Sequence, residues 1–136
     1  MRPEEREEAF RQTMEAYTAG DLERTLGFYH PEIEVTAPDW MNAGPYRGHE
    51  GFLAWSGAWY EAWESWAYEL KDVRAIGERH VVARVRVSGR GRTSSIEIDQ
   101  EIGFVVEMKD GLTTYIELTL DEEAAMKVAH EREVSN

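Results

Sequence analysis

The chain has 136 residues, no cysteine, and 27 acidic against 15 basic side chains, which gives a formal net charge of −12 at pH 7. This length suits one compact domain, and we assign residues 1–130 to it, with residues 131–136 as a frayed tail. The negative charge argues against nucleic acid and anionic membranes as partners, because both are negative themselves. The absence of cysteine excludes disulfides, and no apolar run has the length of a signal sequence or membrane span, so we expect a cytoplasmic protein.

The N-terminal part predicts two helices and a short strand. Pro3 and the acidic residues after it suit a first helical turn, and apolar residues at helical spacing extend the helix to Gly20. Asp21 is a candidate cap for a second helix, whose buried face includes Tyr29. Residues 33–37 then alternate apolar and polar side chains, which predicts a strand with one solvent-exposed face.

An aromatic stripe marks the segment from Gly48 to Trp66. Its members recur at steps of three and four residues, the period of an α-helix: Phe52, Trp55, Trp59, Trp63 and Trp66. Each tryptophan has on the order of 150–250 Å² to bury, so the stripe needs a concave surface, either as core or as the wall of a ligand pocket. The loop before it contains Trp40, which is a candidate lid over the pocket mouth or, alternatively, an anchor that pins the loop.

The C-terminal half predicts antiparallel strands and a closing helix. Strands are expected at residues 68–73, 80–88, 95–106 and 112–120, with turns at Gly77, Gly89–Arg92 and Lys109–Gly111, and a helix capped by Asp121. In the second hairpin we expect Arg84 to pair with Asp99. The next pair is then Arg86 with Glu97, and a slip of one residue would oppose charges to isoleucines. The alternation therefore fixes the parity of the register.

Three segments resemble SnoaL-like proteins of the nuclear transport factor 2-like superfamily. They are AYTAGDLERTLGFYHPEIEV (residues 16–35), PYRGHEGFLAW (45–55) and MKDGLTTYIELTLDEEAAMKVA (108–129). The resemblance implies an α+β cone, in which N-terminal helices pack on the concave face of a curved, mixed, mostly antiparallel sheet around an apolar pocket. It also implies a homodimer through the outer sheet face. Relatives include ketosteroid isomerases, polyketide cyclases, limonene epoxide hydrolases and non-catalytic binding domains, so the fold implies no single reaction.

The catalytic groups of two such enzyme families are incomplete in this chain. The positions of the ketosteroid isomerase tyrosine, base and acid are occupied by Thr13, Ala37 and Gly103. The arginine of limonene epoxide hydrolases is kept as Arg84, whereas their two aspartates are replaced by Arg86 and Leu118.

Two acids on the strand facing Arg84 can replace the missing carboxylates. Asp99 and Glu101 share one strand face, and an arginine between them would separate their pKa values, making one the proton donor and the other the acceptor. Arg84, Asp99 and Glu101 are therefore candidate catalytic residues. The alternative is a ladder of exposed cross-strand ion pairs, each contributing little to stability.

The candidate substrate-binding residues are aromatic: Tyr17, Tyr29, Trp40, Phe52, Trp55 and Trp59. We expect a cofactor-free isomerase, cyclase, hydratase or hydrolase acting on a small apolar molecule that contains a ring. The alternative is a non-catalytic module that binds a ligand or dimerises through Ile98, Ile102 and Phe104. The four histidines lack the spacing of a metal site, so we expect neither a metal nor another cofactor.

Overall fold

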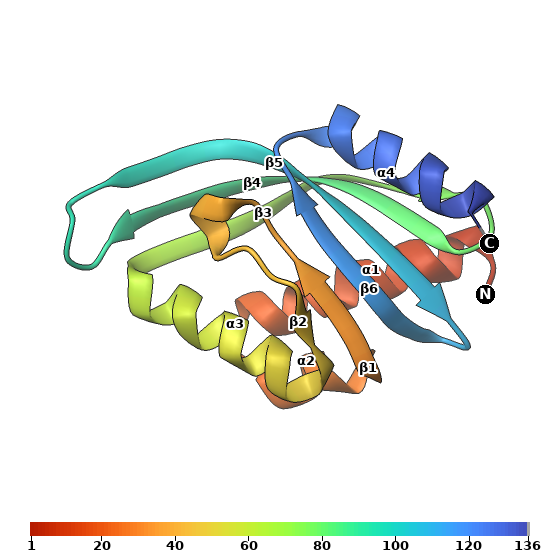
Figure 1. Ribbon diagram of the computed structural model, residues 1–136, viewed down its shortest axis with the longest axis horizontal. Helices are drawn as coiled ribbons and strands as arrows, with labels where there is room; N and C mark the ends of the chain where they lie inside the picture. Colours follow the sequence, from red (N-terminus) through yellow and green to blue (C-terminus); the bar gives the residue numbers. More distant parts are fainter. Residues whose placement is uncertain (136) are drawn as a thin grey trace.

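The computed structural model describes residues 1–135, which form one curved sheet with helices on both faces (Figure 1). The elements in chain order are α1 (Pro3–Thr18), α2 (Leu22–Gly27), β1 (Tyr29–Thr36), the 3-10 helix η1 (Asp39–Met41), β2 (Tyr46–Arg47), α3 (Gly48–Ala62), β3 (Trp63–Ile76), β4 (His80–Gly91), β5 (Glu97–Lys109), β6 (Leu112–Thr119) and α4 (Glu122–Val134). The six strands follow the order β2-β1-β6-β5-β4-β3, and β1 runs parallel to β6 whereas the other pairs are antiparallel. The expected α+β cone is confirmed. Across residues 1–135, no helix is long and apolar enough to cross a membrane.

Alternation along the central strands separates the side chains of the two sheet faces. On the concave face, β4 and β5 contribute to the main core Val81, Ala83, Val85, Val87, Ile102 and Phe104. On the opposite face, Val82 and Val105 pack against Ala125 and Ala129 of α4. Because Ile102 and Phe104 are core residues, the expectation that the chain dimerises through them is wrong.

The predicted caps begin their helices as expected. The Arg24 amide donates to the Asp21 carboxylate at 3.0 Å, and the Ala124 amide donates to the Asp121 carboxylate at 2.8 Å. Each bond satisfies one of the amides that a helix N-terminus leaves without a partner, which fixes the start of α2 and α4.

Three aromatic residues lie on strands rather than on the predicted helices. Tyr29 begins β1, and Trp63 and Trp66 belong to β3, because α2 and α3 are shorter than predicted. Inward-facing side chains recur at every second position of β3, at Trp66, Tyr68 and Leu70. The period of a strand thus replaces the helical spacing of the aromatic stripe after Trp59.

The β4–β5 hairpin is longer than predicted, and its register differs. Arg86 lies opposite Glu101 instead of Glu97, although the parity is as predicted. The difference arises because β4 continues to Gly91, whose amide donates to the Ile96 carbonyl at 2.7 Å and closes a later turn. Arg84 therefore lies opposite Gly103 of β5 and not opposite the predicted Asp99.

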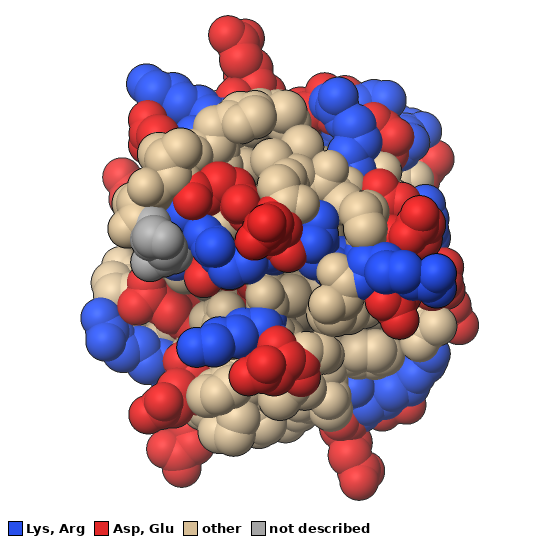
Figure 2. Space-filling model, turned by 90° about the vertical axis from the view of Figure 1, so that its right-hand side faces the viewer, with Lys and Arg blue, Asp and Glu red and all other residues tan. Residues whose placement is uncertain are grey.

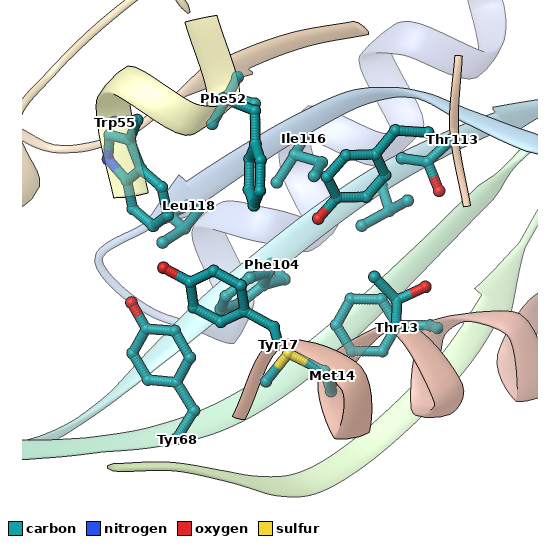
Figure 3. Close-up of a pocket in the computed structure, with 14 residues that line it drawn as sticks. Thr13, Met14, Tyr17, Phe52, Trp55, Tyr68, Phe104, Thr113, Ile116 and Leu118 are labelled. Atoms are coloured by element: carbon teal, nitrogen blue, oxygen red, sulfur yellow. The ribbon is translucent and has the colours of Figure 1, made fainter. Parts of the chain in front are cut away.

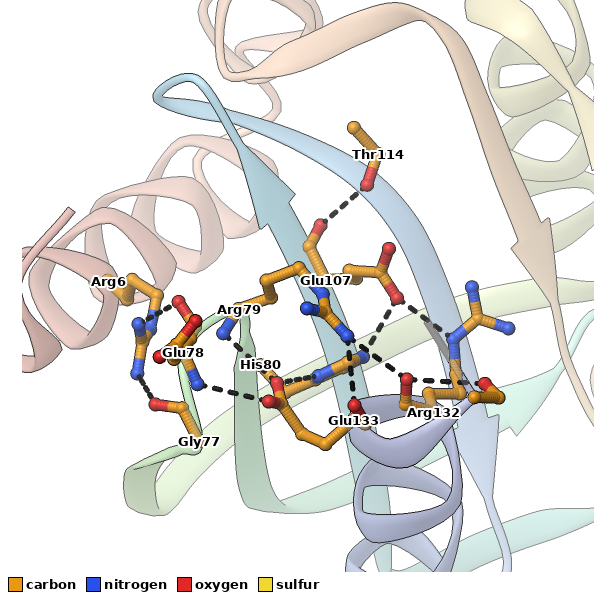
Figure 4. A network of polar contacts seen from close by, with 10 residues as sticks. Arg6, Gly77, Glu78, Arg79, His80, Glu107, Thr114, Arg132 and Glu133 are labelled. Carbon is orange, nitrogen blue, oxygen red and sulfur yellow. Dashed lines mark hydrogen bonds and ion pairs between the residues drawn. The ribbon is translucent and has the colours of Figure 1, made fainter.

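A polar network joins the C-terminal end of α4 to the sheet (Figure 4). The buried ring of His80 contacts Glu133 at 2.5 Å and Glu107 at 2.9 Å, and Arg132 donates to Glu107 at 3.1 Å. These contacts order the helix as far as Val134, so the prediction of a frayed tail is wrong for residues 131–134. Figure 2 views this end of the molecule and shows basic and acidic side chains interspersed, without a large patch of one sign.

Candidate functional site

A cavity lies between α1, α3 and the concave face of the sheet (Figure 3). Its 14 lining side chains are each at most 9% exposed. The space between the lining atoms, with the mouth included, is about 510 Å³, and the centre of a water-sized sphere can occupy about 40 Å³ of it. Since one water needs about 10–15 Å³ of such space and a cavity that holds benzene has roughly 150 Å³, this cavity has room for about three waters, and a ligand with a ring requires its walls to move.

The periodicity of each element directs its side chains into this cavity. One face of α1 contributes Phe10, Thr13, Met14 and Tyr17, at helical spacing. Phe52 and Trp55, which lie three residues apart on α3, form part of the opposite wall. The strands contribute inward-facing residues, including Tyr29 and Val35 from β1, Tyr68 from β3, Phe104 and Val106 from β5, and Ile116 and Leu118 from β6.

The polar character of the cavity comes mainly from hydroxyl groups. Tyr17, Tyr29 and Tyr68 enter from three different elements, and none of the 14 lining residues carries a charge. Burial raises the pKa of all three phenols well above its ordinary value. These hydroxyls therefore stay neutral at physiological pH and can donate hydrogen bonds.

Tyr17 and Tyr68 form a nearly parallel pair. Their ring centroids are 6.0 Å apart, the ring planes differ by 18°, and both hydroxyls point toward the same side in Figure 3. Ser56 of α3, which is 1% exposed, donates to the Tyr17 oxygen at 3.2 Å, so the Tyr17 proton stays available to another acceptor. The buried Tyr68 hydroxyl has no hydrogen-bond partner in the described part of the chain. Leaving such a group unpaired costs about 1–3 kcal/mol, which makes this position a candidate ligand contact.

Four of the predicted substrate-binding residues line the cavity: Tyr17, Tyr29, Phe52 and Trp55. The indole nitrogen of Trp55 donates to the Met41 carbonyl at 2.8 Å, which fixes the orientation of this part of the wall. The expected position is wrong for the other two residues. Trp59 is fully buried behind the wall, with its ring centroid 5.6 Å from that of Tyr68, and Trp40 is 36% exposed in η1. Met41, the next residue of η1, is fully buried, whereas Trp40 is not among the residues that line the cavity.

The candidate catalytic residues Arg84, Asp99 and Glu101 lie on the outer face of the sheet. Arg84 pairs with Glu101 at 2.9 Å, and Arg86 pairs with Asp99 at 2.7 Å, with all four side chains at least 37% exposed. The expectation that they face the pocket is wrong, because the residues on either side of Arg84 are directed into the core and leave it on the opposite face. The structure shows the alternative arrangement, an exposed ladder of ion pairs.

The sequence contained signals for two site residues that its interpretation missed. Tyr68 alternates with Trp66 and Leu70, which places it on the same face of β3 as two core residues. Ser56 follows Phe52 by four residues and shares its side of α3. Within residues 1–135, no group of three or more histidine, aspartate and glutamate side chains is arranged to hold a metal ion.

The comparisons with known proteins agree with this geometry. Residues 10–116 match the family model of the SnoaL-like domain. The chain belongs to the SnoaL-like family. No match was found among curated protein sequences.

Several solved structures share the fold of this SnoaL-like chain. An NTF2-like protein from Burkholderia thailandensis is 20% identical with a TM-score of 0.79, over 96% of this chain and 98% of the other. TerC, co-crystallized with polyporic acid, is 19% identical with a TM-score of 0.74, over 90% and 96% of the two chains. A protein from Xanthomonas campestris pv. campestris, provisionally described as a polyketide cyclase, is 15% identical with a TM-score of 0.71, over 85% and 90%. At these identities the likeness shows the fold alone.

Proposed function

We propose that this SnoaL-like chain binds a small apolar molecule containing a ring, in the cavity between α1, α3 and the sheet. The observation that carries the proposal is a cavity whose wall consists of buried aromatic and aliphatic side chains, in which a few hydroxyls supply the polar contacts. Such sites derive affinity from apolar burial and orientation from a small number of hydrogen bonds.

The empty space is smaller than one ring, so a ligand that contains a ring requires the wall to move. Met14 is the most adaptable lining side chain, because its unbranched thioether has several rotatable bonds. TerC, which shares this fold, was co-crystallized with polyporic acid, and this supports a small organic molecule as the occupant here.

Binding is tested by calorimetric titration with cumene, a neutral single-ring hydrocarbon. Saturable binding is expected, and a substitution that fills the cavity, Val106→Phe, should abolish it. Val35→Phe fills the cavity from β1 and serves as a second blocking variant if the first does not fold, as judged by its thermal melt. The exposed variant Arg84→Ala is the control and should bind as the wild type does. Absence of binding to the wild type, or equal binding to a folded blocking variant, would contradict the proposal.

A second candidate function is a cofactor-free isomerase, cyclase, hydratase or hydrolase that uses the same cavity. The specific observation in its favour is the unpaired hydroxyl of Tyr68 beside that of Tyr17, because neutral phenols can polarise a carbonyl and stabilise negative charge that develops on its oxygen. If a substrate is found, Tyr68→Phe should lower kcat more than it changes KM. An unchanged kcat would contradict a catalytic role for this hydroxyl.

We also propose that two copies associate through the outer sheet face, as the resemblance implies. The exposed pairs Arg84–Glu101 and Arg86–Asp99 place both signs of charge on this face, so a two-fold arrangement can oppose unlike charges from the two copies. Sedimentation should show a dimer at low salt, and Arg86→Glu should shift the protein toward the monomer. A wild-type monomer at every concentration would exclude the dimer.

A further inference from the structure

We infer that the ligand of this cavity is a neutral ring compound whose carbonyl oxygen accepts hydrogen bonds from both Tyr17 and Tyr68. This inference rests on the proposed function and narrows it from apolar rings in general to aryl ketones and related neutral carbonyl compounds.

The donor geometry supports a single shared oxygen. The two rings are nearly parallel, their hydroxyls point the same way, and their centroids are 6.0 Å apart. One ligand oxygen placed between the two hydroxyls can therefore accept a hydrogen bond from each. The two phenols do not satisfy one another, since the Tyr68 hydroxyl is without a partner in residues 1–135.

The direction of the hydrogen bonds favours an oxygen that only accepts. The Tyr17 oxygen already accepts a hydrogen bond from Ser56, so this phenol has its own proton left to donate. The Tyr68 proton is likewise uncommitted. A carbonyl oxygen has two lone pairs and no proton, so it can satisfy both donors, whereas an alcohol would add a proton that needs an acceptor of its own.

The surroundings favour a neutral ligand. None of the lining side chains is charged, and the whole chain carries a net charge of −12. A carboxylate or phosphate would lose its hydration without gaining a cationic partner, which is strongly unfavourable. Burial holds both phenols in the neutral form, in which they can donate.

The ring of the ligand has a defined place next to these donors. Phe52 packs edge-on against Tyr17, with centroids 5.8 Å apart, and Phe104 packs edge-on against Tyr68, with centroids 6.3 Å apart. The two phenylalanines reach the cavity from different elements, Phe52 from α3 and Phe104 from β5. A flat ring that packs against both phenylalanines therefore lies next to the tyrosine pair.

The test compares four single-ring compounds of similar size by calorimetric titration: acetophenone, 1-phenylethanol, cumene and benzoate. Acetophenone should bind about ten times more tightly than cumene, which has a similar size but no oxygen, and 1-phenylethanol should lie between them. Benzoate should bind most weakly. Tyr68→Phe and Tyr17→Phe should each weaken acetophenone binding about three- to tenfold, whereas Tyr68→Phe should leave cumene binding unchanged or improve it. Tyr60→Phe, a tyrosine of α3 outside the lining, is the matched control and should alter neither ligand.

Two outcomes would overturn the inference, and they differ from failure of the proposed function. Equal affinities for acetophenone and cumene, or an equal loss of both in folded Tyr68→Phe, would remove the paired-donor site while leaving a cavity that binds apolar rings. If none of the compounds binds, the proposed function fails and this inference fails with it. Thermal melts establish that each tyrosine variant is folded.

Discussion

Removal of the Tyr68 hydroxyl should stabilise the ligand-free protein, although most substitutions in a core are destabilising. In Tyr68→Phe the ring keeps its contacts with neighbouring aromatic side chains, at centroid distances of 5.2 Å to Trp66 and 5.6 Å to Trp59. What is lost is a buried hydroxyl that has no partner in the described residues. Because an unpaired buried hydroxyl costs about 1–3 kcal/mol, we expect the free energy of unfolding to rise by about 1 kcal/mol.

Tyr17→Phe is the comparison for this stability experiment, because it removes a hydroxyl that does have a partner. Its loss breaks the 3.2 Å contact with Ser56 and leaves the serine unpaired, so the free energy of unfolding should fall by about 1 kcal/mol. Urea denaturation without ligand measures both changes. In a thermal melt of a chain of this length, each kcal/mol corresponds to a shift of about 3–6 °C in Tm. If Tyr68→Phe is destabilised as much as Tyr17→Phe, the Tyr68 hydroxyl is satisfied in the folded protein and the reasoning is wrong.

Three further predictions concern residues outside the cavity. A Cβ at Gly103 would lie 2.8 Å from that of Ala125, so Gly103→Ala should reduce the free energy of unfolding by about 1–3 kcal/mol in urea denaturation, and a neutral result would mean that α4 moves freely. Burial would raise the pKa of Glu133, but hydrogen bonds from His80 and from backbone amides lower it from 4.5 to about 2. The ionised Glu133 carboxylate should contribute about 2–3 kcal/mol to the free energy of unfolding above pH 4.5, and this contribution should disappear as the pH falls toward 2. The difference in stability between wild type and Glu133→Gln should therefore shrink over that range. A difference that does not change with pH would contradict this. Arg84→Ala should change the stability of the monomer by less than about 1 kcal/mol in the same assay, because its ion pair is exposed in the single chain. A larger loss in the monomer would show that the pair is more than a surface contact.

The fold was predictable where patterning and caps agreed. Asp21 and Asp121 both cap helices, and the alternation along β4 correctly placed Ala83 and Arg84 on opposite faces of the sheet. The register was wrong because the glycines after Ser88 suggested an early turn, whereas the backbone of β4 remains paired as far as Gly91. Local turn propensity cannot show how far two strands continue to pair.

The cavity was predictable only in part. Tyr17, Phe52 and Trp55 follow from helical spacing, which places them on faces that have to be buried. Trp66 belonged equally well to the helical stripe and to a strand, and choosing the helix obscured Tyr68, which lies on the same strand face. Such an ambiguity is resolved by contacts between residues far apart in sequence, which a local pattern does not contain.

The candidate acid and base residues failed for a related reason. An alternating strand shows which residues share a face, but it does not show which face is concave. That assignment comes from the packing of α1 and α3 on one side of the sheet and of α4 on the other. Once α4 covers the face of Val82, Arg84 must lie on that outer face as well.

The most direct test of ligand binding in this cavity is a crystal structure of the protein grown with acetophenone. Electron density for the ring is expected between Phe52 and Phe104, with the ketone oxygen within hydrogen-bond distance of the hydroxyls of Tyr17 and Tyr68. Density for the compound only on the outer surface, with the cavity collapsed or filled by water at a saturating concentration, would contradict the account.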